Sequence, residues 1–345
     1  MRNAVIRVGL AGYGLAGSSF HAPLIRACER MELSAVLTSR DAPERVGTLD
    51  ELLERSDLVV VATPNTTHSD IASAALNASK HVVVDKPFTV TLDEADALIA
   101  LAKRQERVLS VFHNRRWDSD FLTLRNLLPQ LGEIMLFEAH WDRFRPAIKP
   151  GWRELPQPGG GVLSDLGPHM IDQALLLFGM ADAVSADVIA QREGAQVDDY
   201  FDIALHYGER RVCLRCSSLI AAPRPRFAVH GTDASYVKYG LDRQEAQLKA
   251  GMDPRDAAFG LDESQGTLTF GDGRTGKVLP SERGGYRAFY EGVADAILDG
   301  APAPVEPADA RTGLAIIGLA RRAAELGQRL PFPDASSTAA SARAK

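Results

Sequence analysis

The sequence has few cysteines, no excess of basic residues and no long apolar run, and each absence removes a class of protein. Its 345 residues include three cysteines and carry a formal net charge of −6. An acidic chain is unsuited to nucleic acid or to an anionic membrane surface, because both partners need a basic face. No apolar stretch approaches the ~20 residues of a membrane span. The start "MRNAVIRVGL" lacks the zones of a signal peptide. We therefore expect a cytoplasmic protein with no nucleic-acid or membrane partner.

The pair Cys213 and Cys216 could suggest a metal or redox site. It lies in "RRVCLRCSSLI", which has the composition of a strand, and residues three apart on a strand point to opposite faces. No second cysteine pair completes a zinc site. We interpret both residues as structural cysteines and expect no metal.

The first third of the chain has the pattern of a parallel sheet. From residue 4 to about 113, β-branched runs such as "AVIRVGLAG", "SDLVVVATP" and "HVVVD" alternate with helix-like stretches such as "TLDEADALIALAKRQE". Near-continuous apolar strands separated by helices indicate a parallel sheet covered on both faces. A length of 345 residues also suits two domains better than one. We predict a doubly wound α/β domain over residues 1–118.

The remaining chain has a different pattern. Longer strand-like stretches, including "LGEIMLFEAHWDRFRP" and "DDYFDIALHYGERRVCLRCSSLIA", follow one another without a helix after each. This pattern predicts an α+β domain with a mostly antiparallel sheet over residues 119–333. Helices are expected around 161–178, 284–299 and 308–328, and the last is expected to return toward the first domain. The small, polar tail 334–345 is predicted to be disordered.

A glycine-rich turn follows the first predicted strand. In "VGLAGYGLAGSSF", Gly12, Gly14 and Gly17 form a G-x-G-x-x-G motif, with Leu15 and Ala16 between the last two glycines. The first glycine permits a tight turn, the second lets the backbone approach a pyrophosphate, and the third allows close helix packing. The helix N-terminus then offers free N–H groups to the phosphates. We predict a Rossmann domain that binds a dinucleotide at these five residues.

The end of the second predicted strand should select the nicotinamide cofactor. An acidic residue there would bind the ribose 2′-hydroxyl of NAD, but the sequence has Thr38, Ser39 and Arg40. A hydroxyl and a guanidinium suit the 2′-phosphate of NADP, which arginine can bind with two hydrogen bonds. Asp41 would favour NAD if the register moved by one residue. We predict NADP bound at Ser39 and Arg40, with NAD as the alternative.

The segment "HVVVDKPFT", residues 81–89, places a lysine directly beyond a buried strand. Ligands of open α/β sheets bind beyond the carboxyl ends of the strands, so this strand would deliver Lys86 to the cofactor crevice. Pro87 fixes its own φ and keeps the preceding residues extended, which directs the lysine side chain. The alternative is a surface lysine at a strand end, which we would prefer if this segment stood alone; together with the other motifs described below, we predict that Lys86 lies at the reactive centre.

Four motifs in order, "GYGLAG", "ATPNTTH", "DKP" and "GGGVLSDLGPHMID", resemble those of the glucose–fructose oxidoreductase/myo-inositol dehydrogenase family over nearly the whole chain. The opening "GYGLAGSSFHAPLI" is most similar to the NADP-dependent scyllo-inositol dehydrogenase branch. The resemblance implies a Rossmann domain and then an α+β domain whose large open sheet often serves oligomerisation, while its helical side faces the cofactor. It places the family signatures on Asp85, Lys86 and Pro87, where Glu is the usual acid, and on Asp165 and His169.

These residues suit alcohol oxidation, which needs a base to take the hydroxyl proton as hydride leaves the same carbon. We assign His169 as the base in oxidation and the acid in reduction. Lys86 would bind the reacting oxygen and help keep the histidine neutral. Asp165, four residues before His169, would share its helix face and orient the lysine or the substrate hydroxyl, or offset their charge. Because Pro168 would remove a hydrogen bond to the carbonyl of Ser164, we expect this helix to begin only shortly before Pro168.

Further candidates surround this centre. The strand end "VVVATPNTTH" is expected to place three residues beside the nicotinamide and its ribose: Thr63, Pro64 and Asn65. His68 is expected to begin the following helix rather than to touch substrate. Four candidate substrate residues are as compatible with packing as with binding: Arg115, Arg116, Trp117 and, in a loop rich in proline and glycine, Trp152.

The sequence therefore predicts an NAD(P)-dependent oxidoreductase that acts on a secondary alcohol or ketone of a cyclic polyol or sugar, such as an inositol. It is expected to form a dimer or tetramer. One alternative is a non-catalytic dinucleotide-binding sensor of the same fold, which the joint presence of Lys86, Asp165 and His169 disfavours. Another is a reductase of a different carbonyl or of an imine. Fold-level analogy does not name the substrate.

Overall fold

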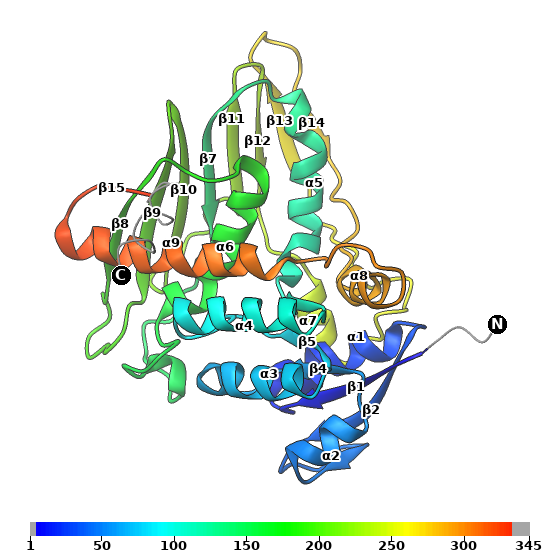
Figure 1. Cartoon of the computed structure of the whole chain (residues 1–345). Helices are drawn as coiled ribbons and strands as arrows, with labels where there is room; N and C mark the ends of the chain where they lie inside the picture. The colour runs from blue at the N-terminus through cyan, green and yellow to red at the C-terminus, as the bar shows by residue number, and fades with distance from the viewer. Residues whose placement is uncertain (1–4, 333–345) are drawn as a thin grey trace.

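The computed structural model describes residues 5–332 and contains two sheets with helices packed around them (Figure 1). The predicted disordered tail, 334–345, lies outside the described residues. Within the described residues, no helix combines the length and apolar character needed to cross a membrane.

The first sheet is parallel throughout and has the strand order β3-β2-β1-β4-β5-β6. The chain moves outward from β1 in one direction and then outward from β4 in the other, so the order reverses between these two neighbours. Such a switch point opens a crevice at the carboxyl ends of the strands. The six strands are β1 (Ile6–Ala11), β2 (Met31–Leu37), β3 (Arg45–Val46), β4 (Leu58–Val61), β5 (His81–Val84) and β6 (Leu109–Val111).

Helices cover this sheet, as the sequence predicts for buried apolar strands. They are η1 (Gly17–His21), α1 (Ala22–Ala27), α2 (Leu49–Glu54), η2 (Asn65–Thr67), α3 (His68–Asn77) and α4 (Leu92–Arg104). The prediction that His68 begins a helix is confirmed. The helix α4 starts with a capping box, in which Thr91 and Glu94 satisfy each other's backbone N–H groups.

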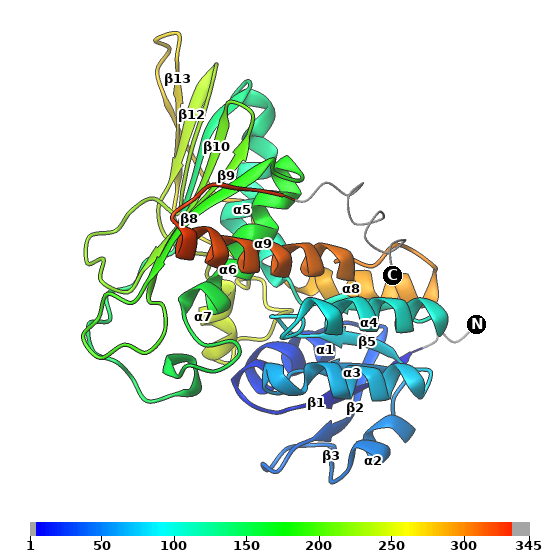
Figure 2. The same ribbon diagram turned by 60° about the vertical axis from the view of Figure 1, so that its left-hand side comes forward.

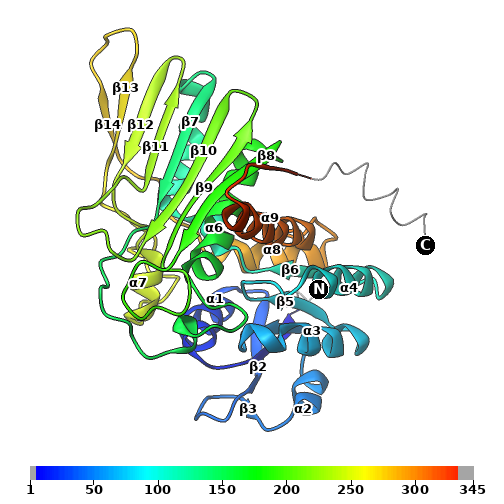
Figure 3. The same cartoon turned by 90° about the vertical axis from the view of Figure 1, so that its left-hand side faces the viewer.

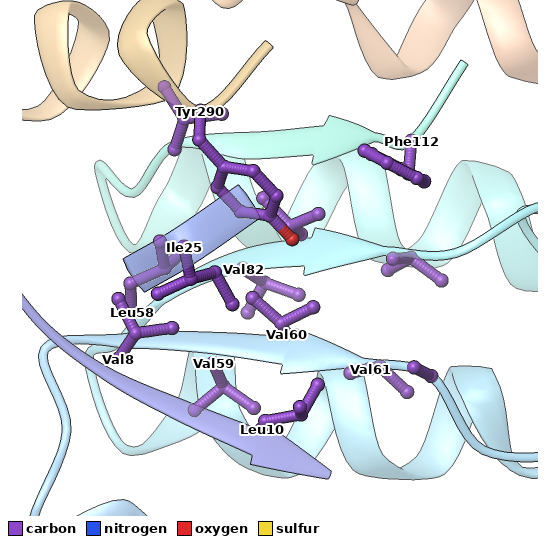
Figure 4. Packing of buried hydrophobic residues seen from close by; sticks show 14 of the residues in the cluster. Val8, Leu10, Ile25, Leu58, Val59, Val60, Val61, Val82, Phe112 and Tyr290 are labelled. Carbon is purple, nitrogen blue, oxygen red and sulfur yellow. The ribbon is translucent and has the colours of Figure 1, made fainter. Parts of the chain in front are cut away.

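The core of the first domain includes a helix from the far end of the chain. Helix α8 (Arg287–Leu298) contributes Phe289, Tyr290 and Val293 to the same buried cluster as the strand valines. Figure 4 shows Ile25 of α1 and Tyr290 of α8 approaching the same group of strand side chains. The sequence predicts this helix but assigns it to the second domain, because contacts between distant segments leave no local pattern.

The second sheet has nine strands in the order β14-β13-β12-β11-β7-β10-β9-β8-β15. All neighbours are antiparallel except β7 and β10, so the predicted mostly antiparallel sheet is confirmed. The nine strands are β7 (Ile134–His140), β8 (Ala183–Ile189), β9 (Tyr200–Tyr207), β10 (Arg210–Ser217), β11 (Phe227–Gly231), β12 (Ala234–Lys238), β13 (Gly266–Phe270), β14 (Lys277–Leu279) and β15 (Leu330–Pro331).

Two long helices cover one face of this sheet. They are α6 (Val162–Phe178) and α9 (Pro307–Leu326), and in Figure 3 both lie on the same side of the strands. As predicted, α9 also returns to the first domain, where it packs on α4 and β6 (Figure 2). The remaining helical segments are η3 (Asn114–Trp117), α5 (Ser119–Leu127), η4 (Leu128–Gln130), η5 (Trp152–Glu154) and α7 (Gln244–Lys249).

The helix α6 confirms the range predicted for it, 161–178, but not the expectation drawn from Pro168. The helix begins at Val162 and contains Pro168, so the expectation that it begins only shortly before Pro168 is wrong. Asp198 explains the earlier start, because its carbonyl accepts from the Val162 N–H at 2.9 Å and its carboxylate accepts from the Leu163 N–H at 2.7 Å. This distant residue caps the helix. Asp165 and His169 therefore lie four residues apart in one continuous helix.

Candidate active site

The glycine turn after β1 has the geometry of a pyrophosphate site. Gly12 has φ +98°, and a Cβ there would lie 2.5 Å from the Ala62 carbonyl oxygen. A Cβ at Gly14 would meet no heavy atom within 4 Å, so one side of this turn is open. The first N–H groups of a helix have no intrahelical partner, which leaves those of Leu15 and Ala16 able to bind phosphate oxygens. The residues present fit a bound dinucleotide.

Two arginines lie beside the end of β2, where the sequence predicts only Arg40. The second is Arg45 of the neighbouring strand β3. The backbone N–H of Arg40 donates to Thr38 Oγ1 at 3.1 Å, and Arg45 Nε donates to the Thr38 carbonyl at 3.2 Å. Ser39, Arg40 and Asp41 are all exposed. No side-chain hydrogen bond from Arg40 is found within residues 5–332, so its guanidinium is available to a phosphate. Arg45 is a candidate that the sequence analysis missed, because it comes from the short edge strand β3.

Lys86 reaches across from the first domain to α6 of the second. Its Nζ donates to the Asp165 carbonyl at 2.7 Å and to Asp165 Oδ1 at 3.1 Å. The Lys86–Pro87 peptide bond is cis. His68 joins the neighbouring strand ends, since its two ring nitrogens lie 3.0 Å from the carbonyl oxygens of Pro87 and Thr63. The turn that carries Lys86 is thereby held against the end of β4.

Asp165 is surrounded by three cations. Besides Lys86, Arg153 Nε lies 3.4 Å from its Oδ1 and Arg143 Nη1 lies 3.7 Å from its Oδ2. Burial alone would raise the pKa of Asp165, but these three cations together hold it below the ordinary value. Asp165 is therefore an ionised counter-charge that fixes the Lys86 ammonium.

His169 is buried beside this pair. Its Nδ1 has no hydrogen-bond partner among the described residues, and its ring stacks on Trp141 at 6.1 Å between centroids. The ring of His113 meets it edge-on at 6.2 Å. Burial lowers the pKa of His169 well below its ordinary value, and the positive charge of Lys86 lowers it further. A neutral imidazole beside a fixed ammonium is ready to accept a proton.

Asn65 lies at the end of β4 as predicted, together with Thr63 and Pro64. Its side chain is buried under the loop before α6, because a Cβ at Gly159 would lie 2.5 Å from Asn65 Nδ2. Thr63 Oγ1 accepts from the Thr67 hydroxyl at 2.7 Å. These three residues lie at the carboxyl ends of the sheet, where their contacts with a cofactor stay a prediction.

Arg115 is the predicted substrate residue that packs nearest to the histidine. Its guanidinium lies over the Trp141 ring at 4.7 Å, donates to Tyr286 Oη at 2.9 Å and pairs with Glu245. Trp141 in turn stacks on His169. Arg115 therefore supports the wall of the site from behind.

The other three candidate substrate residues have mixed surroundings. Arg116 is buried in ion pairs with Asp172 and Asp309, and Trp117 packs edge-on against Phe289 at 5.9 Å. These contacts are those of packing residues. Trp152 is exposed, and the guanidinium of its neighbour Arg153 covers its ring at 4.5 Å. A substrate contact from any of the three stays a prediction.

Four residues at the centre were missed by the sequence analysis: Trp141, His113, Arg143 and Arg153. Trp141 and Arg143 continue β7 beyond its assigned end, since their N–H groups donate to the carbonyls of Arg215 and Ser217 on the β10 side. The available signal was the alternation of "AHWDRF", which places Trp141 and Arg143 on one face of an extended strand.

Comparisons with known proteins identify the family of the chain. Residues 6–113 match the model of an "oxidoreductase family, NAD-binding Rossmann fold", and residues 127–332 match an "oxidoreductase family, C-terminal alpha/beta domain". The chain is 46% identical over 328 residues to the uncharacterized oxidoreductase YdgJ of Escherichia coli, covering 91% of this chain and 95% of YdgJ. It is 40% identical over 336 residues to the scyllo-inositol 2-dehydrogenase (NADP(+)) IolW of Bacillus subtilis, covering 93% of each protein.

Solved structures show the same relationship. An oxidoreductase from Yersinia pestis superposes with a TM-score of 0.91 at 44% identity, covering 96% of this chain and 98% of that one. The oxidoreductase YvaA of Bacillus subtilis superposes with a TM-score of 0.92 at 38% identity, covering 96% and 100%. The chain belongs to the glucose–fructose oxidoreductase/myo-inositol dehydrogenase (Gfo/Idh/MocA) family and is an NAD(P)-dependent dehydrogenase.

Proposed function

We propose that this enzyme favours NADP and interconverts a secondary alcohol and a ketone on a cyclic polyol or sugar, such as an inositol. The observation that carries the proposal is the ammonium of Lys86, held by Asp165 beside the buried His169. The name of the relative IolW, scyllo-inositol 2-dehydrogenase (NADP(+)), supports both the substrate class and the cofactor. The two arginines at the end of β2 also support NADP.

The roles follow from the charges. The nicotinamide cofactor, when bound, accepts or supplies the hydride. His169 is neutral and takes the hydroxyl proton in oxidation or returns it in reduction. The Lys86 ammonium hydrogen-bonds the reacting oxygen and stabilises the negative charge that develops there. Asp165 fixes that ammonium and stays ionised.

The cofactor contacts are assigned to this chain's own groups. The N-terminus of the helix after Gly14 would bind the pyrophosphate through the N–H groups of Leu15 and Ala16. Arg40 and Arg45 would bind the 2′-phosphate. Neither assignment needs a metal ion.

A substrate panel tests the proposal. Inositols and aldoses are offered with NADP and with NAD to the wild type, Lys86→Ala and His169→Ala, and reduced nicotinamide is followed. We expect turnover of an inositol or a sugar with NADP and a loss of at least 100-fold in both variants. Lys103→Ala, at an exposed position of α4, is the control and should retain wild-type activity. Tight cofactor binding without turnover on any polyol would contradict the proposal.

The open face of the second sheet supports a further part of this proposal, a homo-oligomer. On that face Arg215 of β10 pairs with Glu138 of β7 and with Asp202 of β9, giving a row of alternating charge across three strands. Sedimentation of the wild type tests it, and a monomer at micromolar concentration would contradict it.

A further inference from the structure

Two arginines beside the reactive centre share a single carboxylate, that of Asp165. Arg143 follows β7 and Arg153 lies in η5, and both direct their guanidinium groups toward Asp165, at 3.7 and 3.4 Å. Neither side chain makes a hydrogen bond to another protein group within residues 5–332. A guanidinium carries five N–H donors, so each keeps most of its donors unused.

The neighbouring carboxylates are already bound elsewhere. Glu154 and Asp199 pair with Arg192 at 2.7 and 2.8 Å. Asp142 accepts two hydrogen bonds from Arg224, at 2.7 and 2.8 Å. Among the described residues, these acids therefore form no ion pair with Arg143 or Arg153.

The ion pairs of Asp165 are unequal in charge. Lys86, Arg143 and Arg153 bring three positive charges within 4 Å of the one negative charge of Asp165, so these four groups sum to 3 − 1 = +2. Arg145 lies nearby on the same loop, and its burial and the adjacent Arg143 both lower its pKa. Cations gathered with so few acids form a site for an anion.

Arg143 lies close to the residues proposed to act on the substrate. Trp141, which stacks on His169, and Arg143 are two residues apart in the extended continuation of β7, so both side chains lie on the face toward α6. Arg153 approaches the same carboxylate from the loop before α6. The anion site therefore borders the Lys86–His169 pair.

We propose that the substrate carries an anionic substituent, a phosphate or a carboxylate, which Arg143 and Arg153 bind while Lys86 and His169 act on a CH–OH group of the same molecule. The inference rests on the proposed function and narrows its substrate class. Guanidinium groups suit both anions, because each can donate two parallel hydrogen bonds. The phosphates of the cofactor are assigned to the glycine turn and to the end of β2, so they do not account for these arginines.

Matched substrate pairs test the inference. Glucose is compared with glucose 6-phosphate and with glucuronate, and myo-inositol with an inositol monophosphate, each with NADP. We expect at least one anionic member to exceed its neutral parent tenfold or more in kcat/KM, and the preference to shrink as ionic strength rises. A preference for glucose 6-phosphate or the inositol monophosphate would identify the anion as a phosphate, and a preference for glucuronate would identify it as a carboxylate. Neutral members used as well as the anionic ones would overturn the inference and leave the proposed function intact.

Variants of Arg143 and Arg153 test whether these two residues cause the preference for anionic substrates. Arg143→Gln and Arg153→Gln should each lower the ratio of anionic to neutral kcat/KM at least fivefold, while Arg143→Lys should restore part of it. Arg322→Gln, on the exposed face of α9, is the control and should keep both the ratio and the activity. An unchanged ratio in the first two variants, or a change confined to NADP affinity, would overturn the inference.

A binding measurement separates the two proposals. Calorimetry of the same pairs on the NADPH-loaded protein reports the anion preference even where no member is turned over. Tighter binding of the anionic members without turnover would support the anion site and contradict the proposed function. Equal binding of charged and neutral members would overturn the anion site.

Discussion

Replacing Asp165 by Asn changes one charge at the centre and almost nothing in its shape. The Lys86 ammonium would keep its 2.7 Å bond to the backbone carbonyl of residue 165, but the contact at 3.1 Å would become a bond to a neutral amide. Three cations would then lie around an uncharged group. We expect Lys86 to be less well fixed where it stabilises the reacting oxygen.

The size of the effect follows from the contacts. Lys86 stays charged, so the substitution removes the ion pair but keeps a charge-assisted hydrogen bond, and the Lys86 contact loses about 1–2 kcal/mol. The contacts of Arg143 and Arg153 are longer, partly exposed and not made to the reacting oxygen, so their loss is not counted toward kcat. A loss of about 1–2 kcal/mol corresponds to a fall in kcat of about 5- to 30-fold.

The assay is the steady-state rate at saturating NADP with the best substrate of the panel. Asp96→Asn is the matched control, since Asp96 pairs with Arg311 on the surface of α4, and it should stay within twofold of wild type. Thermal unfolding of both variants confirms that they are folded. A value of kcat for Asp165→Asn within threefold of wild type would refute the reasoning.

Three further predictions concern pH and cofactor choice. Because burial and Lys86 lower the pKa of His169, the acidic limb of kcat/KM for oxidation should lie below pH 6.5, and a limb above that value would contradict the assignment. Arg40→Ala and Arg45→Ala should each lower the NADP-to-NAD ratio of kcat/KM about tenfold, whereas an unchanged ratio would remove these residues from the 2′-phosphate site. Burial lowers the pKa of His81 to about 4, so the unfolded chain binds the extra proton between pH 6.5 and 4. Its share of stability is lost as pH falls through that window. Urea unfolding at pH 7 and 5 should therefore show a smaller loss in His81→Asn than in wild type, and equal losses would count against this origin.

The first domain could be predicted from the sequence because its signals are local. All its strands except the two-residue β3 lie in short apolar runs, and the glycine motif combines a turn, a close approach and a helix start within six residues. Lys86 was assigned from the set of family motifs, because a lysine at the end of a strand is by itself more typical of the surface. Such features need no knowledge of distant contacts.

The features that were missed depend on distant segments. Asp198 caps α6 from outside the helix, which is why the start at Val162 overrides the local effect of Pro168. The packing of α8 on the first domain joins residues 269 positions apart, as in the 2.6 Å contact between His21 Nδ1 and Tyr290 Oη. Neither contact has a periodicity that a sequence pattern could report.

The anion site was missed for a related reason. Arg143 and Arg153 come from a strand continuation and a loop, and only folding brings both to Asp165. In the sequence they are two of many charged residues in an acidic chain. Arg143 and Arg153 are notable because the neighbouring carboxylates pair with other arginines. Only the folded structure shows which carboxylate pairs with which arginine.

His169 is proposed to take a hydroxyl proton while hydride leaves the same carbon. Deuterium transfer to NADP from the best substrate of the panel, labelled at that carbon, tests this role when wild type and His169→Ala are compared. We predict NADPH that carries the label, formed at least 100-fold more slowly by His169→Ala. Unlabelled NADPH, or equal rates in the two proteins, would contradict it.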